Sequence, residues 1–188
     1  MHALDPARPH ARRPGRLIAL AAACALIAVP AAPAVAASGG VGGPGSDGGG
    51  GKPGKAKLRN GLAVPPSNAP SRVKKVIKAA NEIAKGKGYC LGGGHSSWES
   101  SCYDCSGAVS YALHGGRFVS SPMPSGSYRG WGKRGRGKWI TVYAHSGHMY
   151  AVIAGLRFDT SMTPGAGPGW SKEMRSSSGF RVRHPKNF

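Results

Sequence analysis

A cysteine at the predicted start of a helix constrains this chain more than any other feature. Cys105 follows a Gly-rich loop and opens an apolar-periodic segment that ends at Gly115-Gly116. The pattern predicts a helix that begins at Asp104 or Cys105 and buries one face, made of Ala108, Val109, Ala112 and Leu113. The first turn of a helix offers unpaired N–H groups and partial positive charge, which favour the thiolate form of a cysteine. Cys105 is therefore a candidate nucleophile.

The order of the other predicted elements indicates the fold class. Apolar residues at helical spacing predict a first helix from Ser71 to Ala84, with Ser71 as its N-cap. After a Gly-, Ser- and Arg-rich connection come four strand-like segments, at residues 138–144, 147–153, 156–160 and 180–183. Because the helices come first and the strands later, we expect an α+β domain whose N-terminal helices pack on an antiparallel β-sheet.

His148 is the histidine that we expect to act as the base for Cys105. It opens the predicted strand at 147–153, where the backbone can hold its ring rigidly. Ala154-Gly155 fits a two-residue hairpin turn, which would place Asp159 on the same face of the sheet as His148. We expect Asp159 to orient the imidazole. A three-residue turn would place Asp159 on the other face, as an exposed aspartate at a strand end.

Two neighbours of the cysteine complete the predicted site. Tyr103 is expected to point its hydroxyl into the site and to stabilise an oxyanion together with the backbone N–H of Cys105. Ser106 is expected to contribute to oxyanion or substrate binding as well. The alternative for Cys105 itself is a buried cysteine that packs as a small hydrophobic residue.

The number of cysteines supports a free thiol at Cys105. Of the four cysteines, one lies in the leader, which leaves Cys90, Cys102 and Cys105. An odd number in an exported protein predicts one disulfide, here Cys90–Cys102 across a short loop, and one free thiol. Two alternatives stay open: a redox pair formed by Cys102 and Cys105, and a zinc site made of Cys90, His95, Cys102 and Cys105. We expect no metal and no cofactor.

Composition divides the chain into three segments. Residues 1–36 combine a basic leader, an apolar core and the small-residue pattern Ala34-Val35-Ala36, which is typical of an export signal. Residues 37–66 are predicted to be a flexible Gly/Pro-rich basic tether, and residues 67–188 a single catalytic domain. The apolar run of the leader is too short for a good membrane span. We therefore expect a secreted monomer in the cell wall or periplasmic space, without a transmembrane anchor.

The charge of the chain limits its partners. The sequence has 26 Lys and Arg residues against 7 Asp and Glu, which gives a net charge of +19. The leader holds four of the basic residues and one acidic residue, so the remainder carries +16. Such a field attracts polyanions. With an export signal, we expect anionic cell-wall polymers as partners rather than nucleic acid. The alternative is a charge that serves solubility and non-specific adhesion.

At these residues the chain resembles the NlpC-type cell-wall endopeptidases, a papain-like family of bacterial peptidoglycan hydrolases. The family's Asp-Cys-Ser-Gly motif corresponds to residues 104–107, and its Gly-His-Val strand resembles residues 147–149. Its Tyr-x-x-Gly-Gly loop looks like Tyr89, Gly92 and Gly93, and its third polar residue would fall at Asp159. The third residue is often histidine in the family, and Cys90 and Cys102 are not part of its pattern.

The resemblance implies a papain-like fold and an activity without a metal ion. It implies that Cys105, His148 and Asp159 hydrolyse an amide bond in the stem peptides of peptidoglycan. Two other functions stay open: a non-catalytic cell-wall-binding protein that keeps the fold, and a thiol acyltransferase or redox protein.

Overall fold

The computed structural model describes residues 52–162 and 166–188. The predicted export signal and residues 37–51 of the predicted tether lie outside this part of the chain. The elements in chain order are β1 (Lys57–Arg59), β2 (Leu62–Val64), α1 (Ser71–Ala84), α2 (Cys105–Gly115), α3 (Ser125–Tyr128), β3 (Lys133–Arg134), β4 (Ile140–Ala144), β5 (Met149–Ile153), β6 (Leu156–Asp159), β7 (Gly169–Ser171) and β8 (Arg181–His184).

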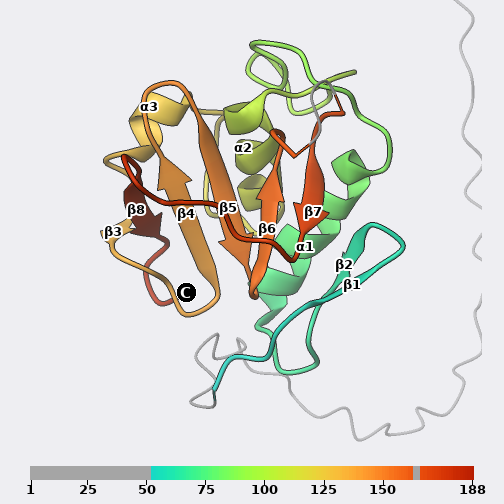
Figure 1. Cartoon of the computed structure of the whole chain (residues 1–188), viewed down its shortest axis with the longest axis vertical. Coiled ribbons are helices and arrows are strands. Elements are labelled where there is room, and N and C mark those ends of the chain that lie inside the picture. The colour runs from blue at the N-terminus through green and yellow to red at the C-terminus, as the bar shows by residue number, and fades with distance from the viewer. Residues whose placement is uncertain (1–51, 163–165) are drawn as a thin grey trace, which may run out of the picture. The chain divides into compact units, whose positions relative to one another are not determined.

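The architecture is a six-stranded antiparallel sheet with α1 and α2 on one of its faces, accompanied by a separate two-stranded sheet of β1 and β2 (Figure 1). The strand order of the six-stranded sheet is β3-β8-β4-β5-β6-β7, and every neighbouring pair is antiparallel. Helix α2 packs on β5 and β6, and α1 packs against α2 and β7. The predicted fold class, α+β with N-terminal helices on an antiparallel sheet, is confirmed. The bounds predicted for both helices are confirmed as well.

Alternation along the central strands separates the core from the outer face of the sheet. Alternate residues of β4 and β5 lie in the hydrophobic core, namely Ile140, Val142, Ala144, Met149, Ala151 and Ile153. The residues between them, which include Tyr143 and Tyr150, therefore lie on the face opposite the helices. The segment 172–180, which joins β7 to β8, crosses this outer face (Figure 1). Its last residue, Phe180, packs edge-on against Tyr150 with ring centroids 5.3 Å apart.

The predicted two-residue turn between β5 and β6 is confirmed. Ile153 pairs with Leu156, and Ala154 and Gly155 have φ values of 47° and 84°. Two consecutive residues with positive φ are what a type I′ hairpin turn requires. Ala151 pairs with Phe158, so Asp159, the next residue, lies opposite Tyr150.

The C-terminal part of the predicted tether belongs to the folded domain instead. Residues 57–64 form the β1–β2 hairpin, which turns at Asn60-Gly61, and Ala56 and Ala63 are buried in the core. The backbone N–H of Ala56 donates to Ala154 O at 2.8 Å. The ordered domain therefore begins well before residue 67. The Asn60-Gly61 pair was a turn signal in this stretch that the overall composition led us to overlook. Asn-Gly favours the positive φ values of 48° and 76° found there.

The N-cap of α1 differs from the prediction, although the bounds of the helix do not. Pro70 occupies the N-cap position, Ser71 is the first helical residue, and no side chain caps this end. Proline sets an extended backbone at this point without an N–H to satisfy. The short elements α3, β3 and β7 were not predicted, because two to four residues carry too little periodicity.

Asn81 of α1 joins three parts of the domain. Its side chain exchanges two hydrogen bonds with the backbone of Ala63 in β2, at 3.0 and 2.9 Å, and accepts one from Trp170 Nε1 at 2.9 Å. Asn81→Ala should lower the free energy of unfolding by about 1–3 kcal/mol, because it leaves largely buried polar groups without partners. Urea unfolding measures the loss. Lys78→Ala, an exposed substitution on the same helix, is the control, and equal stability of both variants would contradict this role.

Candidate active site

Asp104 sets the position of Cys105 by capping helix α2. Its carboxylate Oδ1 accepts a hydrogen bond from Gly107 N at 2.7 Å, as an N-cap side chain does. The other oxygen, Oδ2, accepts one from Gly92 N at 3.1 Å and so connects the helix to the preceding loop. Burial opposes ionisation, but the hydrogen bonds from Gly107 and His95 outweigh it and lower the pKa of Asp104. Cys105, the first residue of the helix, is 8 % exposed and free.

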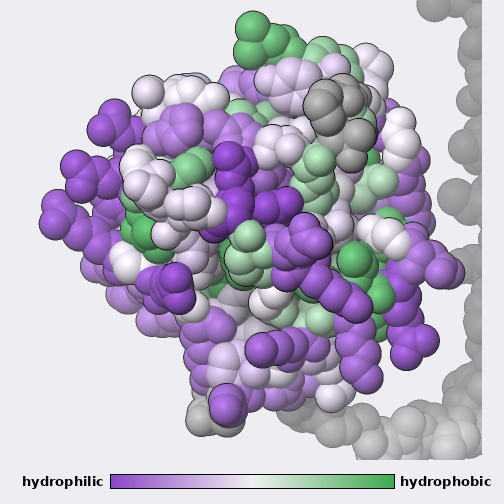
Figure 2. Space-filling model, viewed as in Figure 1, coloured by the Kyte–Doolittle hydropathy of each residue, from purple (hydrophilic) through white to green (hydrophobic). Residues whose placement is uncertain are grey.

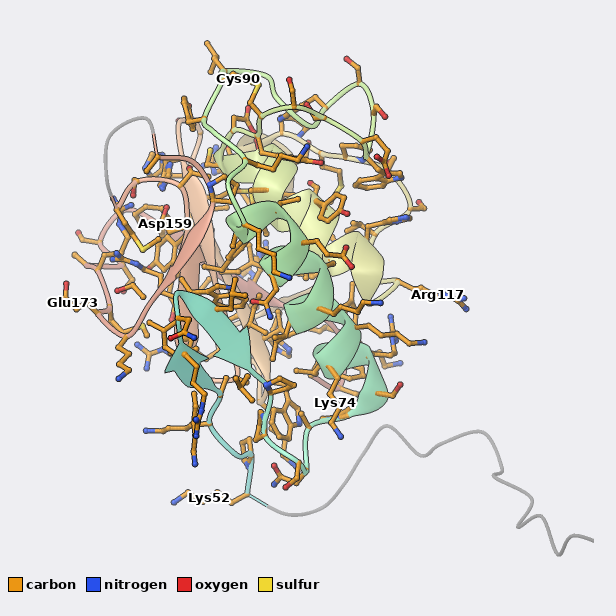
Figure 3. The ribbon with its side chains drawn as sticks, turned by 90° about the vertical axis from the view of Figure 1, so that its right-hand side faces the viewer. Lys52, Lys74, Cys90, Arg117, Asp159 and Glu173 are labelled. Carbon is orange, nitrogen blue, oxygen red and sulfur yellow. A yellow bond between two sulfur atoms is a disulfide. The ribbon has the colours of Figure 1, made fainter. Side chains whose placement is uncertain are left out.

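A disulfide-closed loop covers the start of α2. Cys90 is joined to Cys102, as predicted, and its loop lies at the end of the molecule where α2 begins (Figure 3). Loop and helix touch closely, since a Cβ atom added to Gly107 would lie 2.0 Å from Gly93 O. The disulfide also bears on the two alternatives left open above. Cys102 is bonded to Cys90 rather than Cys105, and two of the four residues considered for zinc are bonded to each other.

The structure places His148 and Asp159 in direct contact. The Nε2 atom of His148 lies 3.0 Å from Oδ1 of Asp159, and both side chains are largely buried, with exposures of 18 % and 0 %. His148 immediately precedes β5, and Asp159 ends β6. The contact therefore follows from the hairpin register, which places the two residues diagonally across neighbouring strands.

Asp159 is held by donors on both of its oxygens. Oδ1 also accepts hydrogen bonds from Thr160 N at 2.8 Å, Ser161 N at 3.1 Å and Ser161 Oγ at 3.1 Å. Oδ2 accepts one from Arg175 Nη1 at 3.2 Å. Burial alone would raise the pKa of Asp159, but the interactions with His148, Ser161 and Arg175 lower it to about 2. The carboxylate is therefore ionised at neutral pH and fixed in one orientation.

His148 interacts with both an acid and the candidate nucleophile. Burial alone would lower its pKa, but the hydrogen bond to Asp159 and the side-chain interaction with Cys105 raise it to about 9. Since Nε2 faces Asp159, Nδ1 is the nitrogen available to the Cys105 thiol. A neutral imidazole in this position can take the thiol proton, and an imidazolium can return a proton to a leaving group.

The structure shows local hydrogen bonds of Tyr103 and Ser106 that were not predicted. Tyr103 is buried, and its hydroxyl donates to Trp98 O and accepts from Ser100 N, so it holds the loop together. The Ser106 hydroxyl is buried too and donates to Asp104 Oδ1 at 3.1 Å. Both hydroxyls are used in these local hydrogen bonds, and a contact with an oxyanion or substrate stays a prediction. His95, considered above as a zinc ligand, places Nε2 3.0 Å from Asp104 Oδ1.

Two residues near the site were not predicted to act there. Tyr89 is 42 % exposed. Its partial burial raises its pKa, and the nearby charges of Cys105 and Asp104 raise it further. The Tyr-x-x-Gly-Gly pattern contained a signal for this tyrosine. Arg175 comes from the segment that crosses the outer face of the sheet, and no spacing in the sequence connects it to Asp159.

Comparison with solved structures gives only weak likeness. No family model matches the chain, and no curated protein matches it. A solved structure of the resuscitation promoting factor interacting protein RipA, mutated at one glutamate, is 20 % identical with a TM-score of 0.43. The match covers 60 % of this chain and 61 % of that chain, so it spans less than two thirds of either. The function proposed below therefore rests on the geometry of the site.

The contact between His148 and Asp159 should make the stability of the domain depend on pH. The raised pKa of His148 means that the pair's contribution to stability is complete below pH about 6.5, and it is lost as the pH rises through about 9. In Asp159→Asn, NMR titration should give His148 a lower pKa, because the imidazolium loses its anionic partner. Glu173→Gln removes an exposed carboxylate instead and should leave this pKa unchanged. An equal pKa in all three proteins would contradict the assignment.

Proposed function

We propose that this protein is a cysteine peptidase that hydrolyses amide bonds in the stem peptides of peptidoglycan. One observation carries the proposal: the His148 imidazole lies 3.0 Å from the Asp159 carboxylate and interacts with Cys105, a free cysteine in the first turn of a helix. A thiol, an imidazole and a carboxylate in this order are the parts that papain-like acyl transfer uses. The cell-wall substrate is supported by the resemblance of residues 104–107 and 147–149, and by the predicted export signal.

The first half of the reaction forms a thioester. Cys105 Sγ, having given its proton to His148, attacks the carbonyl carbon of the amide bond. The backbone N–H of Cys105 donates a hydrogen bond to the oxyanion that develops. His148 then protonates the nitrogen of the leaving amine, the C–N bond breaks, and the acyl group stays on Cys105.

The second half uses the same residues in the opposite direction. Neutral His148 takes a proton from water, and the hydroxide that forms attacks the thioester carbon. The C–S bond breaks, His148 returns the proton to Cys105, and the carboxylic acid leaves. Asp159 keeps Nε2 of His148 in place throughout, because its Oδ1 atom is itself fixed by Thr160 and Ser161.

Incubation with purified muropeptides tests the proposal. Mass spectrometry should detect new free amines with the unaltered protein and none with Cys105→Ala. His148→Gln should lower the rate by roughly 10²–10⁴-fold, the usual contribution of general acid–base catalysis. His114→Gln is the matched control, because His114 lies in the last turn of α2, away from Cys105, and this variant should keep most of the activity.

Two outcomes would contradict the proposal. Undiminished amine release by a folded Cys105→Ala protein would exclude the cysteine as the nucleophile. Absence of any cleavage by the unaltered protein, with muropeptides still bound, would indicate a wall-binding protein that keeps the fold without its chemistry.

A further inference from the structure

A hollow of about 350 Å³ lies on the outer face of the sheet, where the segment 172–180 crosses β4 and β5. Figure 2, which shows this face, has hydrophilic residues over much of it. Four of the residues that line the hollow are cationic, and none is acidic; the cations are Lys55, Arg136, Lys138 and Arg175. Cations that line a concave surface concentrate their field inside it, so the hollow favours an anion.

The floor of the hollow contains two stacked tyrosines. Tyr143 and Tyr150 have ring centroids 4.6 Å apart and an interplanar angle of 2°, and they are only 6 % and 2 % exposed. Burial and the neighbouring Tyr143 raise the pKa of Tyr150 to about 12, so its hydroxyl stays protonated at neutral pH. A protonated phenol can donate a hydrogen bond to an oxyanion, as the rim arginines can.

A second hollow lies next to the first, beside the β1–β2 hairpin. This second hollow has a volume of about 460 Å³ and shares Lys55 and Gly155 with the first. It adds three more cations, Lys57, Arg59 and Lys172, and again no acidic residue. We call the two adjacent hollows together the basic channel, defined by these seven cations. Two adjacent hollows with repeated positive charge fit a ligand that repeats its negative charge, rather than a single ion.

We infer that the basic channel binds a phosphodiester polymer without bases, of the polyol-phosphate kind. Arginine and lysine side chains with nearby hydroxyl donors suit phosphate oxygens. Proteins that bind single-stranded nucleic acids offer exposed aromatic faces on which bases stack. Here Tyr143 and Tyr150 stack on each other and are buried, so neither offers a face to a base. The inference depends on the proposed function only for its setting, the cell wall, and not on hydrolysis by Cys105.

Binding of synthetic poly(glycerol phosphate) oligomers to the full chain tests the inference. The Cys105→Ser variant is used throughout, so that binding is measured whether or not the protein hydrolyses peptides. The dissociation constant is measured by calorimetry, or by the change in tryptophan fluorescence, since Trp139 lines the first hollow. Arg136→Gln/Lys172→Gln should weaken binding about tenfold in moderate salt. For this double variant, the logarithm of the binding constant should depend less steeply on the logarithm of the salt concentration. The slope should be smaller by about 2, since each lost phosphate contact removes about one unit.

A matched control separates the channel from the overall positive charge. Lys75→Gln/Lys78→Gln removes two exposed cations from α1 and should leave both the affinity and the salt slope close to those of the parent. Tyr143→Phe/Tyr150→Phe keeps the stacked rings and should weaken binding, because only the hydroxyls are lost.

Three results would overturn the inference. Equal losses in the channel and α1 variants would show that the charge acts without a dedicated site. Equally tight binding of a single-stranded DNA oligonucleotide with the same number of phosphates would indicate a nucleic-acid surface instead. Binding unaffected by any of these variants would place the polymer elsewhere. Muropeptide cleavage is measured separately, so failure here leaves the proposed peptidase activity intact.

Discussion

The carboxylate of Asp104 is the interaction on which the candidate site depends most. It caps helix α2 through Gly107 N and holds the disulfide-closed loop through Gly92 N, while His95 and Ser106 complete its hydrogen bonds. Because Cys105 is the next residue, everything that fixes Asp104 also fixes the thiol. Gly107 is needed for the same reason, since the loop carbonyl of Gly93 occupies the space where a side chain would lie. The residues around the cysteine thus hold the thiol in position.

The second constraint is the register of the β5–β6 hairpin. A two-residue turn at Ala154-Gly155 places Asp159 on the same face as His148, and an extra residue there would separate them. The segment 172–180 then adds Arg175, whose positive charge helps to keep Asp159 ionised. This arginine also lines the basic channel, so the outer face of the sheet connects the acid–base pair with the surface proposed to bind polymer.

Much of this arrangement could be predicted from local sequence, because local signals determined it. Apolar periodicity and the closing glycines predicted the bounds of α2, the Ala-Gly turn predicted the hairpin register, and the odd cysteine count predicted the Cys90–Cys102 disulfide. Contacts between distant segments could not be predicted in this way. The Tyr103 hydroxyl is bound by a loop whose path no periodicity describes, and Arg175 reaches Asp159 across 16 positions. The β1–β2 hairpin was missed because it lies in a stretch whose overall composition resembles a linker, although Ala63 of β2 and Ala56, just before β1, lie in the core.

The central claim is that Cys105 carries the acyl group while His148 moves protons beside Asp159. The most direct measurement is acid quenching of the protein during turnover of a muropeptide, followed by peptide mapping with mass spectrometry. The account predicts that the peptide containing Cys105 gains the mass of the acyl fragment of the substrate. It also predicts that hydroxylamine, which cleaves thioesters, removes this mass. Turnover with Cys105 unmodified at every time point, or the acyl mass on another residue, would contradict the account.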